Sequence, residues 1–158
     1  MRLSKDGFTL IELLVATTIS VLVMGFSVAG YRYFTDKKVV DLAGDELRSQ
    51  LTTIKNMAVV GERPAGCQSL IKYNLQFVNK QLKYQAICDH NSGSKITLPN
   101  EFFSRVATIS CNDCDFSFKS LSGELIDATE VNFDLSEGVI CKRIKISSGN
   151  ISVQNNCL

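Results

Sequence analysis

The chain has 158 residues, which suits one modest domain with an accessory segment rather than two full domains. Its 17 basic and 16 acidic residues give a formal net charge of +1, so no global field draws the protein to nucleic acid or to an acidic surface. The apolar residues are unevenly spread, because residues 8–31 contain a single charged side chain, Glu12, whereas the later segments are mixed.

The run from Phe8 to Gly30 predicts a membrane-spanning helix. It contains 23 residues, and a bilayer core needs about 20 helical residues. Arg2 and Lys5 precede the run, and basic residues there favour a cytoplasmic N-terminus with the remainder of the chain facing outward. A cleaved secretory signal peptide is the competing interpretation, but its apolar core is shorter and ends at a small-x-small cleavage site.

Glu12 is unusual because a carboxylate inside a membrane span costs about 2.5–3.5 kcal/mol on insertion scales and normally marks a function with a partner. A cut between Gly7 and Phe8 would create an α-amine at Phe8, close enough to neutralise Glu12 of the same subunit or a neighbour. The alternative is a carboxylate near the end of the helix that reaches the headgroup layer. The residue types alone leave both interpretations open.

The segment GFTLIELLVA, Gly7 to Ala16, resembles the cleavage and methylation motif of type IV prepilins at every position. This resemblance implies that residues 1–7 are a leader peptide that ends at Gly7. It implies that an inner-membrane prepilin peptidase cuts there and N-methylates Phe8. It also implies that Glu12 guides the subunit into a filament by pairing with a neighbour's N-terminus, so that other pilin subunits are its partners.

Residues 31–63 are expected to continue the helix beyond the membrane span, residues 8–30. Tyr31, Tyr33 and Phe34 stand beside Arg32, Lys37 and Lys38, an aromatic and basic collar typical of a membrane–water boundary. Apolar residues at spacings of three and four then predict an amphipathic helix, namely Val39, Val40, Leu42, Ala43, Leu47, Leu51, Ile54, Ala58 and Val59.

Gly61 and Pro64 are expected to end this helix, and no proline interrupts residues 8–63. One continuous helix of about 53 residues, roughly 80 Å long, is therefore expected. Many pilins bend their helix at a proline, but this chain has Ala29 at that place, so we do not expect the kink.

Residues 64–158 have the pattern of a β-rich domain, with short alternating segments separated by turn residues. Together with the helix they predict an α+β, pilin-like fold, in which the long N-terminal helix packs on a C-terminal antiparallel sheet. Hairpins are expected at Asn79-Lys80 and at a three-residue loop, Ser148-Gly149-Asn150. The expected strands are 69–78, 81–88, 105–110, 115–119, 130–135, 138–147 and 151–156.

All six cysteines lie after residue 66, which favours disulfides in an oxidising compartment over reduced core thiols. The expected hairpin loop places Cys141 opposite Cys157, and a bridge there would hold the terminal strand. Cys111 and Cys114 are expected to bridge locally, which leaves Cys67 with Cys88. The CxxC pair could instead be a redox centre, or half of a zinc site completed by Cys67, Cys88 or His90.

No catalytic constellation, phosphate-binding loop or cofactor motif stands out, so we expect neither an enzyme, a cofactor nor a metal site. The only histidine, His90, lies in a loop-like stretch, DHNSGS. Lys142, Arg143 and Lys145 form a basic cluster that could hold a nucleic-acid backbone weakly, although such a run is more often a solvated face. After residue 66 the basic and acidic residues balance at nine each.

The C-terminal part faintly resembles the family of H-type secretion pseudopilins and fimbrial T-type minor pilins, through Asn132-Phe133-Asp134, Gly138 and Gly149. Some members bind DNA through arginines after the last glycine, but this chain has Asn150-Ile151-Ser152 there. The resemblances imply a minor pilin or pseudopilin, anchored once in the inner membrane with a periplasmic C-terminal domain. It would then assemble into a type IV pilus or a type II secretion filament. A filament-tip module that contacts DNA or a surface is the alternative.

Overall fold

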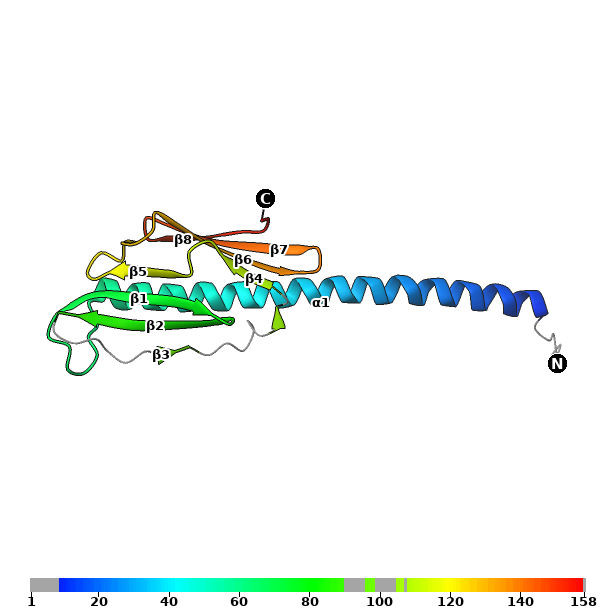
Figure 1. The fold of residues 1–158 in the computed structure, drawn as a ribbon. Helices are drawn as coiled ribbons and strands as arrows, with labels where there is room; N and C mark the ends of the chain where they lie inside the picture. The colour runs from blue at the N-terminus through cyan, green and yellow to red at the C-terminus, as the bar shows by residue number, and fades with distance from the viewer. Residues whose placement is uncertain (1–8, 90–95, 99–104, 107, 158) are drawn as a thin grey trace. The chain divides into compact units, whose positions relative to one another are not determined.

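In a computed structural model of the chain, the residues described are 9–89, 96–98, 105–106 and 108–157. A long helix comes first and short strands follow it (Figure 1). The chain divides into two compact units, Met1–Thr35 and Asp36–Leu158. The helix is α1 (Leu10–Val60), and the strands are β1 (Leu70–Val78), β2 (Gln81–Cys88), β3 (Ile96–Thr97), β4 (Thr108–Cys111), β5 (Asp115–Lys119), β6 (Glu130–Glu137), β7 (Ile140–Ser147) and β8 (Asn150–Gln154).

Helix α1 runs without interruption over 51 residues, about 77 Å at the usual rise per residue. The expectation of one continuous helix is confirmed, and Ala29 lies within it where a proline would have removed a hydrogen bond. The residues buried on α1 all lie in its second half and recur at spacings of three and four: Val40, Ala43, Gly44, Leu47, Leu51, Ile54 and Ala58. Leu42 and Val59, expected in the same stripe, are 38% and 40% exposed at its margins.

The end of α1 is fixed by a glycine in the left-handed conformation. Gly61 has a φ of 70°, and its amide donates to the carbonyl of Ala58 at 3.1 Å. The next amide, of Glu62, reaches back to the carbonyl of Met57 at 2.9 Å. These two bonds form a Schellman motif, which satisfies carbonyls that the helix itself leaves free. The predicted stop at Gly61 is therefore confirmed.

The strands form two antiparallel four-stranded sheets instead of the single sheet expected. One has the order β3-β2-β1-β5 and the other the order β4-β6-β7-β8. The chain passes from the second sheet to the first between β4 and β5, and Phe116 and Phe77 from the first sheet each meet Phe133 of the second. Sequence pattern alone does not separate the sheets, because strand alternation is the same whichever neighbour a strand pairs with.

The hairpin turns set the register of the strands. Asn79 and Lys80, with φ of 52° and 57°, join β1 to β2 in a two-residue turn of the kind that matches strand twist. Between β7 and β8 the turn is Ser148-Gly149, and Ser147 pairs with Asn150. The expected three-residue loop is thus wrong by one residue, because Ser148 adopts the positive φ that a two-residue turn requires.

The core lies between α1 and both sheets within the unit Asp36–Leu158. The helix contributes the buried stripe described above, and the first sheet contributes Leu75, Phe116 and Phe118 among others. The second sheet adds a row of fully buried side chains: Val131, Phe133, Leu135, Ile144 and Ile146. Burying each such side chain contributes about 1.5–3 kcal/mol, so a sheet–helix–sheet core accounts for the α+β fold that the sequence predicts.

Candidate functional site

The start of α1 is held by a reciprocal pair of side chains. Thr9 is the N-cap, and both its amide and its hydroxyl donate to Glu12 Oε2, at 2.9 and 2.8 Å. The Glu12 amide returns a bond to Thr9 Oγ1 at 3.3 Å. This arrangement is a capping box, which satisfies amides that the first helical turn leaves without partners. Glu12 therefore has a helix-capping role as well as the pairing role expected for it. Gly7 and Phe8 lie outside the described residues.

The first half of α1 is apolar and exposed. It is long and apolar enough to cross a membrane, and none of its most apolar stretch is buried against the remainder of the described chain. Leu10 is 82% exposed and Phe26 78% exposed, and most of the large apolar side chains between them are exposed as well, which makes a contiguous apolar surface. The hydroxyls of Thr18 and Ser20 bond back to carbonyls one turn earlier, so these two polar groups are satisfied within the helix.

Lys142, the first residue of the basic cluster, is nearly buried. Its ammonium lies 3.1 Å from Asp41 Oδ1 and 3.4 Å from Asp45 Oδ1, both on α1. The lysine side chain is only 9% exposed, and its stem crosses the helix at Gly44. A Cβ built on Gly44 would lie 2.8 Å from Lys142 Cδ, so the glycine is what gives the stem room. Lys142 joins β7 to α1 rather than presenting a charge to solvent.

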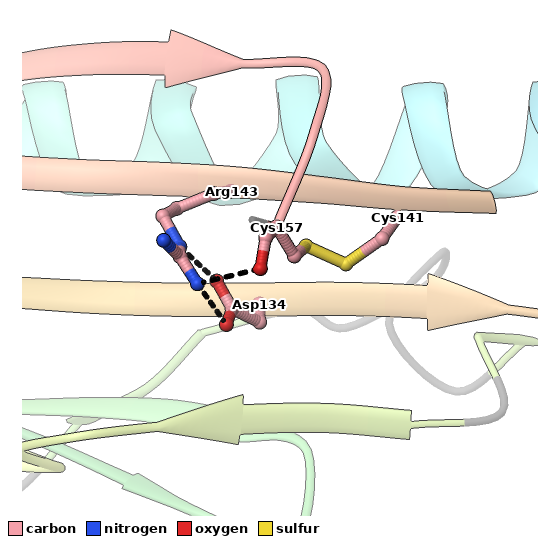
Figure 2. The surroundings of a disulfide bond; sticks show 4 residues. All are labelled: Asp134, Cys141, Arg143 and Cys157. Carbon is pink, nitrogen blue, oxygen red and sulfur yellow. Dashed lines mark hydrogen bonds and ion pairs between the residues drawn. A yellow bond between two sulfur atoms is a disulfide. The ribbon is translucent and has the colours of Figure 1, made fainter.

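Arg143 and Lys145 are also held by carboxylates. Figure 2 shows the Arg143 guanidinium facing Asp134 on β6, with Nε to Oδ1 at 2.7 Å and a second nitrogen to Oδ2 at 2.8 Å. The second nitrogen also donates to the Cys157 carbonyl at 3.1 Å. Lys145 lies 2.6 Å from Glu130, and this contact, followed by one from Asn132, lowers the pKa of that carboxyl. Because each cation already faces an acid, the cluster is poorly suited to hold phosphates.

The six cysteines form three bridges in the structure: Cys67–Cys88, Cys111–Cys114 and Cys141–Cys157. These are the pairs favoured above, but the expectation that the hairpin register places Cys157 directly opposite Cys141 is wrong. In the observed register Ser147 pairs with Asn150 and β8 ends at Gln154, so Cys157 reaches Cys141 by a bend after the strand (Figure 2). With Cys111 and Cys114 bridged, neither sulfur is a thiolate that could bind zinc in this state.

The Cys111–Cys114 loop lies where the chain passes between the two sheets. Asn112 fixes this loop to β6, since its amide donates to the Asn132 carbonyl at 3.2 Å and its Oδ1 accepts from the Asn132 amide at 2.6 Å. On the other side, the Cys114 carbonyl accepts from the Phe77 amide of β1 at 2.8 Å. The short loop thereby connects both sheets, which is a structural role.

Elsewhere, the part of the chain that the structure describes has few candidate binding or catalytic groups. A pocket of about 400 Å³ lies beside the end of α1 and is lined by Met57, Arg63, Tyr73 and Tyr84 among others. Tyr73 donates to the Glu62 carbonyl at 2.8 Å, and burial raises the pKa of its phenol. The described residues contain no cluster of three metal-ligating side chains, and His90 lies outside them.

Two features of the site escaped the sequence reasoning. One is the capping box, which the pattern Thr9-x-x-Glu12 signals in the primary sequence. The other is the position of Lys142 against α1. Its signal in the sequence is the stretch DLAGD, residues 41–45, in which two aspartates stand one turn apart with a glycine between them. A glycine inside a helix costs about 1 kcal/mol against alanine, so its presence there calls for a packing reason.

Comparisons with known proteins place the N-terminal segment only. The family described as the prokaryotic N-terminal methylation motif matches residues 2–28. No curated protein matches the chain, and no solved structure matches it either. The match covers Thr9, Glu12 and the apolar part of α1, where the geometry above is found.

Proposed function

We propose that this chain is a minor pilin or pseudopilin, a structural and assembly subunit of a type IV pilus or type II secretion filament, because residues 2–28 match the methylation motif and α1 is apolar and long enough to cross a membrane. The observation that carries the proposal is Glu12. It is the single charged side chain of residues 8–31, it stands four residues after Phe8, and it lies inside the methylation motif. A carboxylate so placed needs a cationic partner in lipid.

In the proposed pathway the leader, residues 1–7, is removed after Gly7 by a prepilin peptidase, which then methylates the new N-terminus at Phe8. Before the cut, Thr9 stabilises the carboxylate of Glu12 through the two bonds to Oε2. After the cut, the α-amine of a neighbouring subunit supplies the opposite charge. The span 8–30 crosses the inner membrane with its N-terminus in the cytoplasm, and the unit Asp36–Leu158 lies in the periplasm, where its disulfides form.

The test separates the charge of Glu12 from its capping role. Glu12→Ala removes both, whereas Glu12→Gln keeps an oxygen that can accept from Thr9 and so keeps the capping box. We expect both variants to be cut by prepilin peptidase at the wild-type rate, as measured by loss of the leader in mass spectrometry. We expect neither to enter filaments when co-expressed with the assembly machinery. Glu12→Gln filaments at wild-type yield would refute the charge-pairing role.

Processing is tested at Gly7. A bulky residue there, as in Gly7→Leu, is expected to leave the precursor uncut and unassembled, and Gly7→Ala to be cut slowly. Normal cleavage of Gly7→Leu would mean that the peptidase does not act at this position. An uncut wild-type precursor in cells that process another prepilin would overturn the proposal as a whole.

A filament-tip module that binds DNA is the second candidate, and the pairing of Lys142, Arg143 and Lys145 with acids weakens its support. The unit Asp36–Leu158 should therefore give no shift of duplex DNA in a gel at low salt. A salt-sensitive shift that Arg143→Ala and Lys145→Ala abolish would favour this function instead. The folded state of each variant is checked by circular dichroism, because both side chains also hold β6 to β7.

A further inference from the structure

The residues that follow the membrane span on α1 form a collar, Tyr31–Lys38, in which basic residues outnumber acidic ones. It contains three basic residues, Arg32, Lys37 and Lys38, and one acidic residue, Asp36. Every residue of the collar is exposed except Asp36, which is half-buried. The aromatic members are widely open, with Tyr31 72%, Tyr33 57% and Phe34 62% exposed. We propose that this collar binds the headgroups of anionic phospholipids in the outward leaflet of the membrane.

The position of the collar follows from the length of the span. The part of α1 up to Gly30, residues 10–30, has 21 residues, about 32 Å of helix, which matches a hydrocarbon core of about 30 Å. The residues directly after it therefore lie among the headgroups on the far side. Tyrosine is enriched at that depth, and lysine and arginine there can extend to lipid phosphates.

The arrangement around the helix favours lipid over a protein partner. At about 100° per residue, Arg32, Lys37 and Lys38 point in three directions about 100–140° apart. A protein that docked on α1 would meet one face and leave the other basic side chains outside the contact. A bilayer surrounds the helix and meets all three, so a collar with charge on every side suits an anionic headgroup layer.

The distribution of basic residues on the two flanks of the span is also opposite to what the proposed orientation would favour. Basic residues normally gather on the cytoplasmic flank of a span, yet the outward flank has three and the leader has two, Arg2 and Lys5. Removal of residues 1–7 would take Arg2 and Lys5 away, so the basic side chains left at the ends of the span would be those of the outward flank. Basic residues kept on the unfavourable side need a function of their own, and retention of the processed subunit at an anionic surface supplies one. This step rests on the proposed topology.

The experiment uses the absence of tryptophan from the chain. Tyr33→Trp places a single fluorescent donor in the collar, and the full precursor is reconstituted in phosphatidylcholine vesicles. These vesicles contain trace dansyl-labelled phosphatidylglycerol or dansyl-labelled phosphatidylcholine. Energy transfer from the tryptophan then reports which lipid is enriched around the collar. At low salt we expect a preference of about fivefold or more for phosphatidylglycerol, since one basic residue near an anionic surface contributes roughly that factor.

Two charge variants decide the result in the Tyr33→Trp background. Arg32→Gln/Lys37→Gln/Lys38→Gln should bring the preference close to one, and about 1 M salt should do the same in the parent. The matched variant, Arg48→Gln/Lys83→Gln/Lys119→Gln, removes as many charges outside the collar and should keep the preference. Equal transfer to both lipids in the parent, or an equal loss in the two triple variants, would overturn the proposal.

Failure of this inference is distinguishable from failure of the proposed function. Lipid preference is measured on the uncut precursor, without peptidase or assembly partners. Normal cleavage and assembly with no lipid preference would refute the collar alone. A clear lipid preference in a chain that is never cut or assembled would refute the filament subunit and leave the collar as a membrane-surface site.

Discussion

Gly44→Ala should destabilise the protein, although the same change in most helices stabilises. Alanine is favoured over glycine inside a helix by about 1 kcal/mol. The new methyl group, however, would lie 2.8 Å from Lys142 Cδ and 3.1 Å from Cε. The lysine cannot easily withdraw, because its stem is buried and its ammonium is tied to Asp41 and Asp45. Overpacking of a buried site costs about 1–3 kcal/mol, so the net loss should be about 1 kcal/mol.

Removal of the lysine stem should reverse the sign. In a Lys142→Ala background, Gly44→Ala meets no stem and should stabilise the fold by about 1 kcal/mol through helix propensity alone. The coupling between the two positions is then about 2 kcal/mol. Lys142→Met is the matched control, since it removes the charge but keeps atoms where the lysine stem lies. Gly44→Ala should therefore be less favourable in the Lys142→Met background than in the Lys142→Ala background.

The assay is urea unfolding of the oxidised unit Asp36–Leu158, which contains the core and all three disulfides. Unfolding is followed by far-ultraviolet circular dichroism in all combinations of the substitutions, and the m-value is compared between variants to verify a common unfolded state. If Gly44→Ala has the same effect whether residue 142 is lysine or alanine, the close approach between Gly44 and the lysine stem does not matter for stability.

Three further predictions concern the turn, the C-terminal bridge and the surface acids. Gly149→Ala should cost more than about 2 kcal/mol on urea unfolding, because Gly149 has a φ of 77° and a Cβ there would lie 2.6 Å from a backbone oxygen of Gly123. Removing the bridge by Cys141→Ser/Cys157→Ser should cost about 3 kcal/mol in the same assay, since the sequence separation is 16 residues. The ionised form of Glu130 is stabilised first by Lys145, which lowers its folded-state pKa. Its contribution is thus present above the unfolded value of about 4.3 and is lost as pH falls through the folded pKa. Lys145→Met should flatten the acid limb of a stability–pH profile.

Each of these predictions has a control in the chain. Gly66 has a φ of 85° but nothing within 4 Å of a Cβ, so Gly66→Ala should show only the backbone cost of about 1 kcal/mol. The bridge between Cys111 and Cys114 closes a loop of only three residues in sequence separation and should contribute less, about 2 kcal/mol. Lys119→Met should leave the acid limb unchanged. Equal effects at Gly149 and Gly66, or at Lys145 and Lys119, would contradict the contacts described.

The long helix and most strands could be predicted because their signals are local. A 23-residue apolar run, a three-and-four stripe and a glycine stop define α1, and turn residues at Asn79-Lys80 define the first hairpin. The two-residue strand β3 and the division into two sheets were not predictable in this way. Both depend on which distant segment pairs with which, and alternation along a strand contains no information about its neighbour.

The residues of the candidate site could be predicted only in part. Glu12 stands out because a charge in an apolar run is conspicuous, whereas its partner Thr9 looks like any hydroxyl residue until the helix start is located. Lys142 was misread as part of a basic surface because charge in sequence says nothing of burial. Only the fold brings it against Gly44, about a hundred residues away in the chain, where an otherwise exposed cation becomes part of the packing.

The path of β7 along α1 has a mechanical consequence for the proposed filament subunit. Near one end of β7, Lys142 lies between Asp41 and Asp45, and just beyond the other end Gly149 abuts Gly123, which in turn packs on Val59. A pull along the axis of α1 would therefore act in shear on the contact between α1 and the β7 segment. The apolar contacts and the ion pairs of Lys142 would then be strained together instead of one at a time. The Cys141–Cys157 bridge closes the outermost end against fraying, so such a subunit should yield less readily to tension along the helix than to a sideways pull.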